Sequence, residues 1–161
     1  MRAIAVMLFS LLLTSGATAR PLSLPHACTS LILRKAPGWK TLVPDPEVAD
    51  WAKKKRLNPV VTNGDFDGNQ TLDWATIGSI DGKTKIVLCL TTATGRFMVV
   101  AEDGGCTDHV YTIRRRTKVP NLDNGGDEVL KTDAVATSCF EKSGRVFVYD
   151  DGAFRTFFNS D

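Results

Sequence analysis

This chain is poor in histidine and lacks the common catalytic motifs. Its 161 residues include two histidines, His26 and His109, which lie far apart in the sequence. There is no G-x-S-x-G nucleophile turn, no H-E-x-x-H zinc motif and no Gly-rich phosphate loop. These absences exclude the usual forms of serine, zinc and phosphate-transfer enzymes, so we expect a non-catalytic protein. Hydrolysis by a pair of carboxylates stays open, because Asp and Glu together number 18.

Long apolar runs are also missing, except near the start of the chain. Arg2 precedes the apolar run Ala3–Leu13, and the small residues Ala17–Ala19 follow it. This order is typical of a secretory signal peptide cleaved after residue 19. No later window approaches the ~18 apolar residues of a membrane-spanning helix. We therefore expect one periplasmic or secreted domain, residues 20–161, that does not insert into a membrane after cleavage.

Charge of one sign is not in excess. Lys and Arg number 20 against 18 Asp and Glu, which gives a formal net charge of +2. The basic runs Lys53–Arg56 and Arg114–Arg116 are not interleaved with aromatic residues, as single-stranded nucleic-acid sites usually are. Nucleic acid is therefore not an expected partner, and both runs are interpreted as solvated faces.

Cysteine is limited to four residues, Cys28, Cys89, Cys106 and Cys139. An even number in an exported chain favours two disulfides over a zinc site, since no C-x-x-C pair is present. Three pairings are possible. The shorter loop favours Cys89 with Cys106, which leaves Cys28 for Cys139.

The pattern of apolar residues predicts an α+β, mainly β fold: an antiparallel sheet of about six to eight strands with one N-terminal helix packed on it. Residues 20–39 contain several prolines and predict an irregular arm. A helix is expected to begin with Asp45 as N-cap and Pro46 as its first residue, and to end before Pro59.

From Val60 onward the apolar period is two, which is typical of strands. The dipeptide Asp81-Gly82 predicts a tight hairpin between strands 74–80 and 85–91. Residues 121–127 predict a polar loop, although Asn121, Asp123 and Asp127 weakly resemble a second cation turn. Further strands are expected at 96–101, 109–114, 129–140, 145–149 and 154–158.

One stretch, Asn63–Trp74, has more oxygen-bearing side chains, at a more regular spacing, than an ordinary surface loop requires. Oxygen donors recur at alternate positions, and a curled backbone would direct them at one hard cation, for which calcium (Ca2+) is the natural candidate. An EF-hand is excluded, because Gln70 and Thr76 stand where its glycine and glutamate are required. The candidate ligands are the side chains of Asp65, Asp67, Asn69 and Asp73 and the carbonyl of Thr71.

Residues 64–75, G-D-F-D-G-N-Q-T-L-D-W-A, resemble the calcium loop of FG-GAP and VCBS-type repeats, approximately G-D-F-[DN]-G-D-G-x-x-D-[LIVWY]-[AV]. The resemblance covers about residues 60–90 and implies the same five ligands. Asn69 stands where the family usually has Asp, and Gln70 where it usually has Gly. A single copy cannot close a propeller. The chain looks like small exported bacterial proteins that carry one such repeat.

Three functions are compatible with these features. The first is a non-catalytic protein-binding module with one structural calcium loop and an unknown protein partner. The second is an inhibitor or immunity protein against a secreted enzyme. The third is a metal-assisted hydrolase that uses the same loop, which an open coordination position beside a cleft would favour. A metal-free turn, in which the loop caps its own backbone, is the alternative to calcium.

Overall fold

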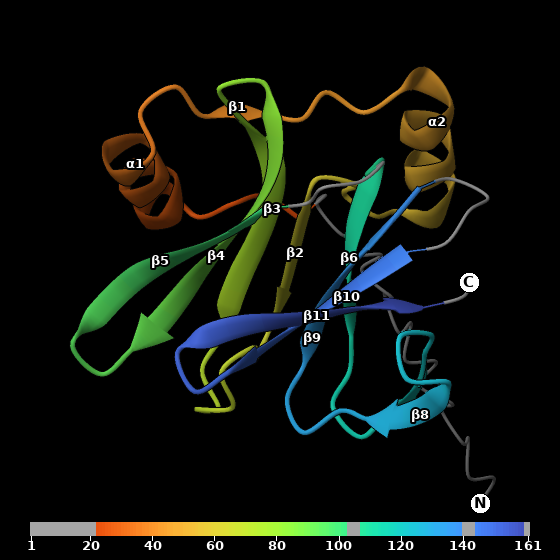
Figure 1. The fold of residues 1–161 in the computed structure, drawn as a ribbon. Coiled ribbons are helices and arrows are strands. Elements are labelled where there is room, and N and C mark those ends of the chain that lie inside the picture. Colours follow the sequence, from red (N-terminus) through yellow and green to blue (C-terminus); the bar gives the residue numbers. More distant parts are fainter. Residues whose placement is uncertain (1–21, 103–106, 140–143, 160–161) are drawn as a thin grey trace, which may run out of the picture.

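The computed structural model describes residues 22–102, 107–139 and 144–159. Within these ranges the chain forms 11 strands and two helices, and every paired strand is antiparallel. The expected α+β, mainly β fold with an N-terminal helix on a sheet is confirmed (Figure 1). The strands divide among three sheets instead of forming one. The predicted signal peptide, residues 1–19, lies outside the described residues.

The first sheet has five strands in the order β1-β3-β4-β5, and β2 also pairs with β3. The predicted hairpin is the connection between β3 and β4, where Asp81 and Gly82 adopt φ angles of +52° and +75°. Two successive positive φ angles match the twist of the flanking strands. The strands are β1 (Lys40–Thr41), β2 (Val61–Gly64), β3 (Asp73–Ile80), β4 (Lys83–Thr92) and β5 (Gly95–Glu102).

The second sheet has the order β11-β10-β9-β6, and β7 and β8 form a separate hairpin. The polar loop expected at 121–127 is present but shorter, because Gly125 at φ +71° permits a tight turn at 122–125 and β8 begins at Gly126. The strand expected at 129–140 is shorter and covers Ala134–Ser138, whereas Val129 ends the preceding strand. The strands are β6 (His109–Ile113), β7 (Lys118–Asn121), β8 (Gly126–Val129), β9 (Ala134–Ser138), β10 (Gly144–Asp150) and β11 (Ala153–Asn159).

The two larger sheets meet where β2 lies beside β6. The Thr62 and Thr112 hydroxyls are 2.7 Å apart, and the Thr112 hydroxyl also donates to the Asn63 carbonyl at 2.8 Å. Apolar side chains from both sheets share one core, so the sheets fold as one body. Its buried members are Phe66, Ala75, Ile77, Ile86, Leu88, Leu90, Val110, Val135 and Phe147.

The helix predicted after Asp45 is α2 (Pro46–Lys55), and the Asp45 carboxylate accepts the Glu47 N–H at 3.0 Å, as an N-cap does. The expected irregular arm at 20–39 is wrong, because it contains α1 (His26–Lys35). Its prolines flank this helix, with Pro25 at the N-cap and Pro37 beyond the end. Helix α1 is the one that packs on the first sheet, and its buried residues are Cys28, Leu31 and Ile32.

The disulfide joins Cys28 to Cys89, with their Cα atoms 5.8 Å apart, and so links α1 to β4. The pairings expected from loop length, Cys89–Cys106 and Cys28–Cys139, are both wrong. Closure entropy changes slowly with loop length, whereas helix packing brings Cys28 directly onto Cys89. Cys139 is also disulfide-bonded, and Cys106 lies outside the described residues. Neither described helix is long and apolar enough to cross a membrane.

Candidate metal centre

The acidic loop connects β2 to β3, and the pairing of these two strands closes it. The last pair in their register is Gly64 with Asp73, so the two ends of the loop are fixed side by side. Phe66 anchors the loop, because its side chain is buried in the shared core. At Gly64 a Cβ atom would lie 2.8 Å from the Phe66 ring and 2.9 Å from an Asp133 carboxylate oxygen, so only glycine fits there.

The loop brings three of the predicted ligands together. Carboxylate oxygens of Asp65, Asp67 and Asp73 all lie within 4.8 Å of one another, and this is the only such group of metal-binding side chains among the described residues. The Asp65 Oδ1 atom is buried and has no hydrogen-bond partner there. An orphaned carboxylate oxygen beside two other carboxylates matches the donor set that calcium prefers.

Asp73 is the most enclosed of the three and is completely buried. Its Oδ2 accepts the N–H of Phe66 at 3.0 Å, and its Oδ1 accepts the N–H of Thr91 at 2.7 Å. Burial, together with the nearby charge of Asp67, nevertheless raises the pKa of Asp73 to about 6. A bound cation would favour the charged carboxylate and offset both effects.

The Asn69 side chain is turned differently from the prediction. The Asn69 Oδ1 atom accepts the Thr71 N–H at 2.8 Å and also its hydroxyl, whereas the Asn69 Nδ2 donates to Asp67 Oδ2 at 2.9 Å. The amide N–H₂ of Asn69 therefore occupies the side of Asp67 on which an oxygen ligand was expected. Ligation by Asn69 Oδ1 requires the amide to rotate away from Thr71.

Strand β4 holds the loop through one residue that the sequence did not single out, Thr91. Its carbonyl accepts the Asn69 Nδ2 at 2.6 Å and the Thr71 hydroxyl at 2.9 Å, and its own hydroxyl donates to the Leu72 carbonyl at 2.9 Å. With the N–H that it donates to Asp73, Thr91 fixes the second half of the loop to the end of β4.

The backbone of the acidic loop is left-handed at two positions. Gly68 has φ +78°, and Gln70, which stands at a usual glycine position, has φ +66°. A residue with a Cβ atom is strained in this left-handed region. The turn at Gln70 therefore requires a conformation that glycine would adopt without this strain.

Gln70→Gly should stabilise the protein by about 0.5–1 kcal/mol, because glycine adopts positive φ without the Cβ clash. The measurement is thermal unfolding in the presence of chelator. Gln70→Ala is the matched control, since it removes the amide but keeps the Cβ atom, and it should bring no gain. Equal stability of the two variants would contradict the strained turn.

A second residue missed by the sequence analysis, Asp133, fixes the first half of the loop. Its Oδ2 accepts the Asp65 N–H at 3.1 Å, its Oδ1 accepts the Arg115 N–H at 2.9 Å, and its own N–H donates to the Asp65 carbonyl at 3.1 Å. Arg114 Nη1 adds an ion pair at 2.8 Å. Although burial opposes it, these donors hold the pKa of Asp133 below its ordinary value.

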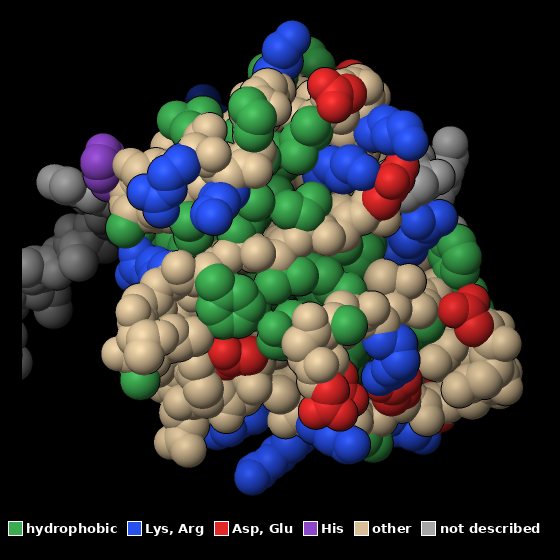
Figure 2. Space-filling model, turned by 60° about the vertical axis from the view of Figure 1, so that its left-hand side comes forward, with side chains coloured by type: hydrophobic (Ala, Val, Ile, Leu, Met, Phe, Trp, Pro, Cys, Tyr) green, Lys and Arg blue, Asp and Glu red, His purple; other side chains and the backbone are tan. Residues whose placement is uncertain are grey.

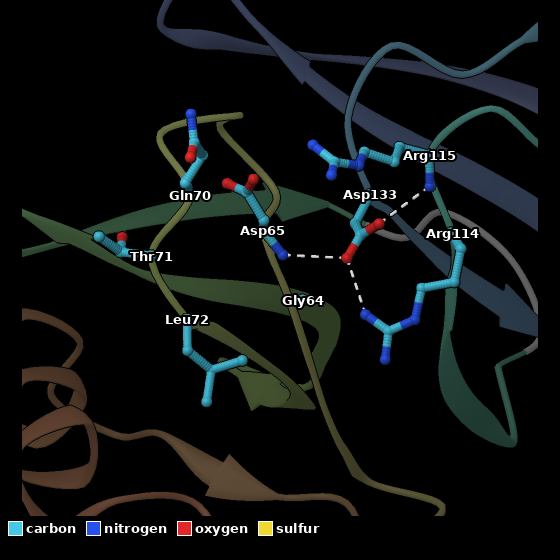
Figure 3. Close-up of a pocket in the computed structure, with 8 residues that line it drawn as sticks. All are labelled: Gly64, Asp65, Gln70, Thr71, Leu72, Arg114, Arg115 and Asp133. Carbon is cyan, nitrogen blue, oxygen red and sulfur yellow. Dashed lines mark hydrogen bonds and ion pairs between the residues drawn. The ribbon is translucent and has the colours of Figure 1, made fainter.

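A pocket of about 530 Å³ lies beside the loop. Figure 3 shows the Asp133 carboxylate in it, bonded to the backbone of Asp65 and Arg115 and to the Arg114 side chain. Two acidic and two basic side chains therefore border the same space. The lining residues are Gly64, Asp65, Gln70, Thr71, Leu72, Arg114, Arg115 and Asp133.

The remaining candidate residues do not join this cluster. His109 lies in β6 and contacts the rings of Trp51 and Tyr111, at centroid distances of 5.0 and 5.7 Å. In the weaker candidate turn, Asn121 accepts the Asp123 N–H at 3.1 Å and Asp127 pairs with a lysine, as in a self-capped hairpin. Comparison with protein-family models, curated proteins and solved structures finds no match for this chain.

Proposed function

We propose that this is a periplasmic or secreted, non-catalytic protein in which one calcium ion stabilises the loop between β2 and β3. The observation that carries the proposal is the convergence of Asp65, Asp67 and Asp73, with oxygens within 4.8 Å of one another. Three carboxylates this close repel each other unless a cation or protons intervene. Their convergence on a closed loop at a strand end favours a structural ion.

The residues that would hold calcium are these three aspartates, with Asn69 after an amide rotation and the Thr71 carbonyl. The ion would supply positive charge and oxygen coordination. The protein's own contribution is to fix the ligands in advance: Thr91 binds one half of the loop and Asp133 the other. Calcium would then connect the start of β3 to residues that are already bonded to β4 and to the segment before β9.

The kinship with FG-GAP and VCBS-type repeats belongs to the same proposal. It is supported by the positive φ angles of Gly68 and Gln70, two loop positions at which the pattern usually has glycine. Asn69 replaces one carboxylate of that pattern. The resulting site has a lower negative charge, so a dissociation constant on the order of 0.1–1 mM, typical of extracellular modules, is expected.

Millimolar calcium should raise the melting temperature of the mature protein, and chelator should reverse the shift. A ligand that binds only the folded state stabilises it by about 1.4 kcal/mol at a tenfold excess over Kd, which corresponds to roughly 5 °C for a domain of this size. Magnesium should produce a smaller shift, since it gives up its waters reluctantly. Calorimetric titration measures the uptake directly.

Two variants make this calcium test specific. Asp67→Ala should abolish the calcium response, whereas Asp50→Ala, which removes an exposed carboxylate on α2, should leave it unchanged. Asn69→Asp should melt lower without calcium, because a fourth carboxylate then faces Asp67, and should gain more from calcium. No uptake at several millimolar, with Asp67→Ala melting like the unchanged protein, would make the loop a metal-free turn.

The role that we assign to the folded domain is binding of a protein partner. Inhibition of a secreted enzyme is the alternative form of this role. It is supported by large apolar side chains that are left exposed, which are Leu33 on α1, Val43 between β1 and α2, and Leu72 in the loop before β3. The test is the capture of proteins from periplasmic extract by the immobilised mature protein. The control is capture from the same extract by the same protein after partial unfolding. Equal capture by both forms would count against a specific partner.

The second candidate function is a metal-assisted hydrolase, favoured by the pocket that Asp65 shares with Arg114 and Arg115. A cation held there would have a cleft beside it, which hydrolysis requires. Ester, glycoside and phosphate substrates test this function. Turnover that disappears in Asp67→Ala and persists in Asp50→Ala would replace the non-catalytic assignment.

A further inference from the structure

Strand β5 (Gly95–Glu102) forms one edge of the first sheet, and no strand pairs with its outer side within the described residues. An exposed edge is a template for another strand, and proteins usually protect it with proline, a bulge, a central charge or short length. Strand β5 has none of these. It spans eight residues, its register with β4 is unbroken, and its two charges lie near its ends.

The register determines which backbone groups face outward. Asp81 and Gly82 form a two-residue turn with positive φ, so Ile80 and Lys83 are a hydrogen-bonded pair. From this pair onward, hydrogen-bonded and non-hydrogen-bonded pairs alternate along β3 and β4. Odd-numbered residues of β4 thus bond to β3, and even-numbered ones bond to β5. The even-numbered residues of β4 pair with odd-numbered residues of β5. The N–H and C=O groups of the even-numbered residues of β5 therefore point outward, and these residues are Arg96, Met98, Val100 and Glu102.

The side chains along this edge are apolar between two charged ends. Phe97 on one face and Val100 on the other are each more than a third exposed, while Met98 packs against α1. Figure 2, which brings this side of the molecule forward, shows a band of hydrophobic side chains with charged side chains at its margins. The edge therefore offers both hydrogen bonds and apolar surface.

The other edge strands of the two larger sheets are very short or make a backbone contact on their outer side. On the outer side of β11, the N–H of Leu122 donates to the carbonyl of Phe158 at 2.9 Å. The outer side of β6 faces β2, where the N–H of Val110 donates to the Pro59 carbonyl at 2.8 Å. Strand β1 has two residues only. Among the described strands, β5 is the long edge without such a partner.

We propose that two copies of this chain pair through β5, antiparallel and about a twofold axis at Val99. Outward backbone groups must face each other, which restricts the register to pairs whose residue numbers have an even sum. Placing Arg96 opposite Glu102 of the second copy aligns the whole strand and forms about eight backbone hydrogen bonds, more than a shift of two residues allows. The same register sets Met98 opposite Val100.

Charge complementarity supports a second copy as the occupant. Arg96 and Glu102 have opposite signs and equal distances from the twofold axis, so each end of the paired strands carries one favourable cross-strand pair. Glu102 already accepts from Lys85 at 2.8 Å and lies near Lys83 at 3.4 Å. Its side chain is still 51% exposed, which leaves room for Arg96 of the second copy. The continuous sheet would carry both α1 helices on one face.

The first test is the oligomeric state of the mature protein by sedimentation equilibrium up to about 1 mM, because a one-strand interface is small and dimerises weakly. The unchanged protein should show a monomer–dimer equilibrium. Val100→Pro removes an outward N–H without touching the ladder to β4, and it should weaken dimerisation at least tenfold. Val100→Thr keeps the N–H and the branched shape, and it should dimerise within about threefold of the unchanged protein.

The second test uses charge reversal and does not depend on the folding of the proline variant. Arg96→Glu alone and Glu102→Arg alone each create like-charge pairs and should weaken self-association by about tenfold. Their mixture restores both opposite-charge pairs and should form a mixed dimer within about threefold of the original affinity. A protein that stays monomeric at 1 mM, a dimer indifferent to Val100→Pro, or a mixture no better than its components would overturn the proposal.

Discussion

Removal of the Cys28–Cys89 disulfide should lower the free energy of unfolding by about 4 kcal/mol, a larger loss than we expect from the removal of calcium or of the Asp133 carboxylate. The bridge spans 61 residues of sequence, so it excludes many extended conformations of the unfolded chain. Both sulfur atoms belong to buried residues, at 0% and 1% exposure, and Cys28→Ala/Cys89→Ala therefore retains apolar side chains at both positions. Denaturation in urea without a reducing agent measures the difference.

Thr29→Ala is a suitable control for the disulfide variant, because it changes an exposed residue of the same helix and removes one long hydrogen bond of 3.3 Å. It should cost less than about 0.5 kcal/mol. Peptide mapping under non-reducing conditions should connect the peptides that contain Cys28 and Cys89. If the double variant unfolds within about 1 kcal/mol of the unchanged protein, the bridge does not restrict the unfolded chain as its length implies.

Local patterns in the sequence predicted the elements whose geometry is set by neighbouring residues. The Asp81-Gly82 hairpin and helix α2, with its Asp45 cap, depend on turn and capping chemistry within a few residues. Helix α1 was missed because its prolines were interpreted as breakers, although Pro25 lies at its N-cap. The disulfide pairing was missed because it depends on how α1 packs on β4, which is a tertiary property.

The residues of the candidate site also divide into those that local sequence predicted and those that it did not. Alternate spacing predicted that the loop would bring Asp65, Asp67 and Asp73 together, since all three lie within one turn of chain. Thr91 and Asp133 come from β4 and from the segment before β9, far away in sequence, and no local motif marks them. The orientation of Asn69 was not predictable either, because the competing acceptor is the Thr91 carbonyl.

Asp133→Ala should destabilise the fold by about 3 kcal/mol, because it leaves the N–H groups of Asp65 and Arg115 without the carboxylate that accepts them. Asp133 is 6% exposed, so water replaces those hydrogen bonds poorly. The ion pair with Arg114 contributes little to this loss, since 65% of the Arg114 side chain is exposed. Urea denaturation in chelator isolates the stability of the loop from any effect of calcium.

Two companion variants separate the hydrogen bonds of Asp133 from its charge. Asp133→Asn keeps one acceptor oxygen and should lose about half as much stability, whereas Asp123→Ala, an exposed carboxylate in the turn between β7 and β8, should lose less than about 0.5 kcal/mol. Asp133 is not among the proposed ligands, yet Asp133→Ala should also weaken the calcium response, because the backbone of Asp65 is no longer fixed. A variant that loses stability but binds calcium unchanged would show that Asp65 keeps its position without Asp133.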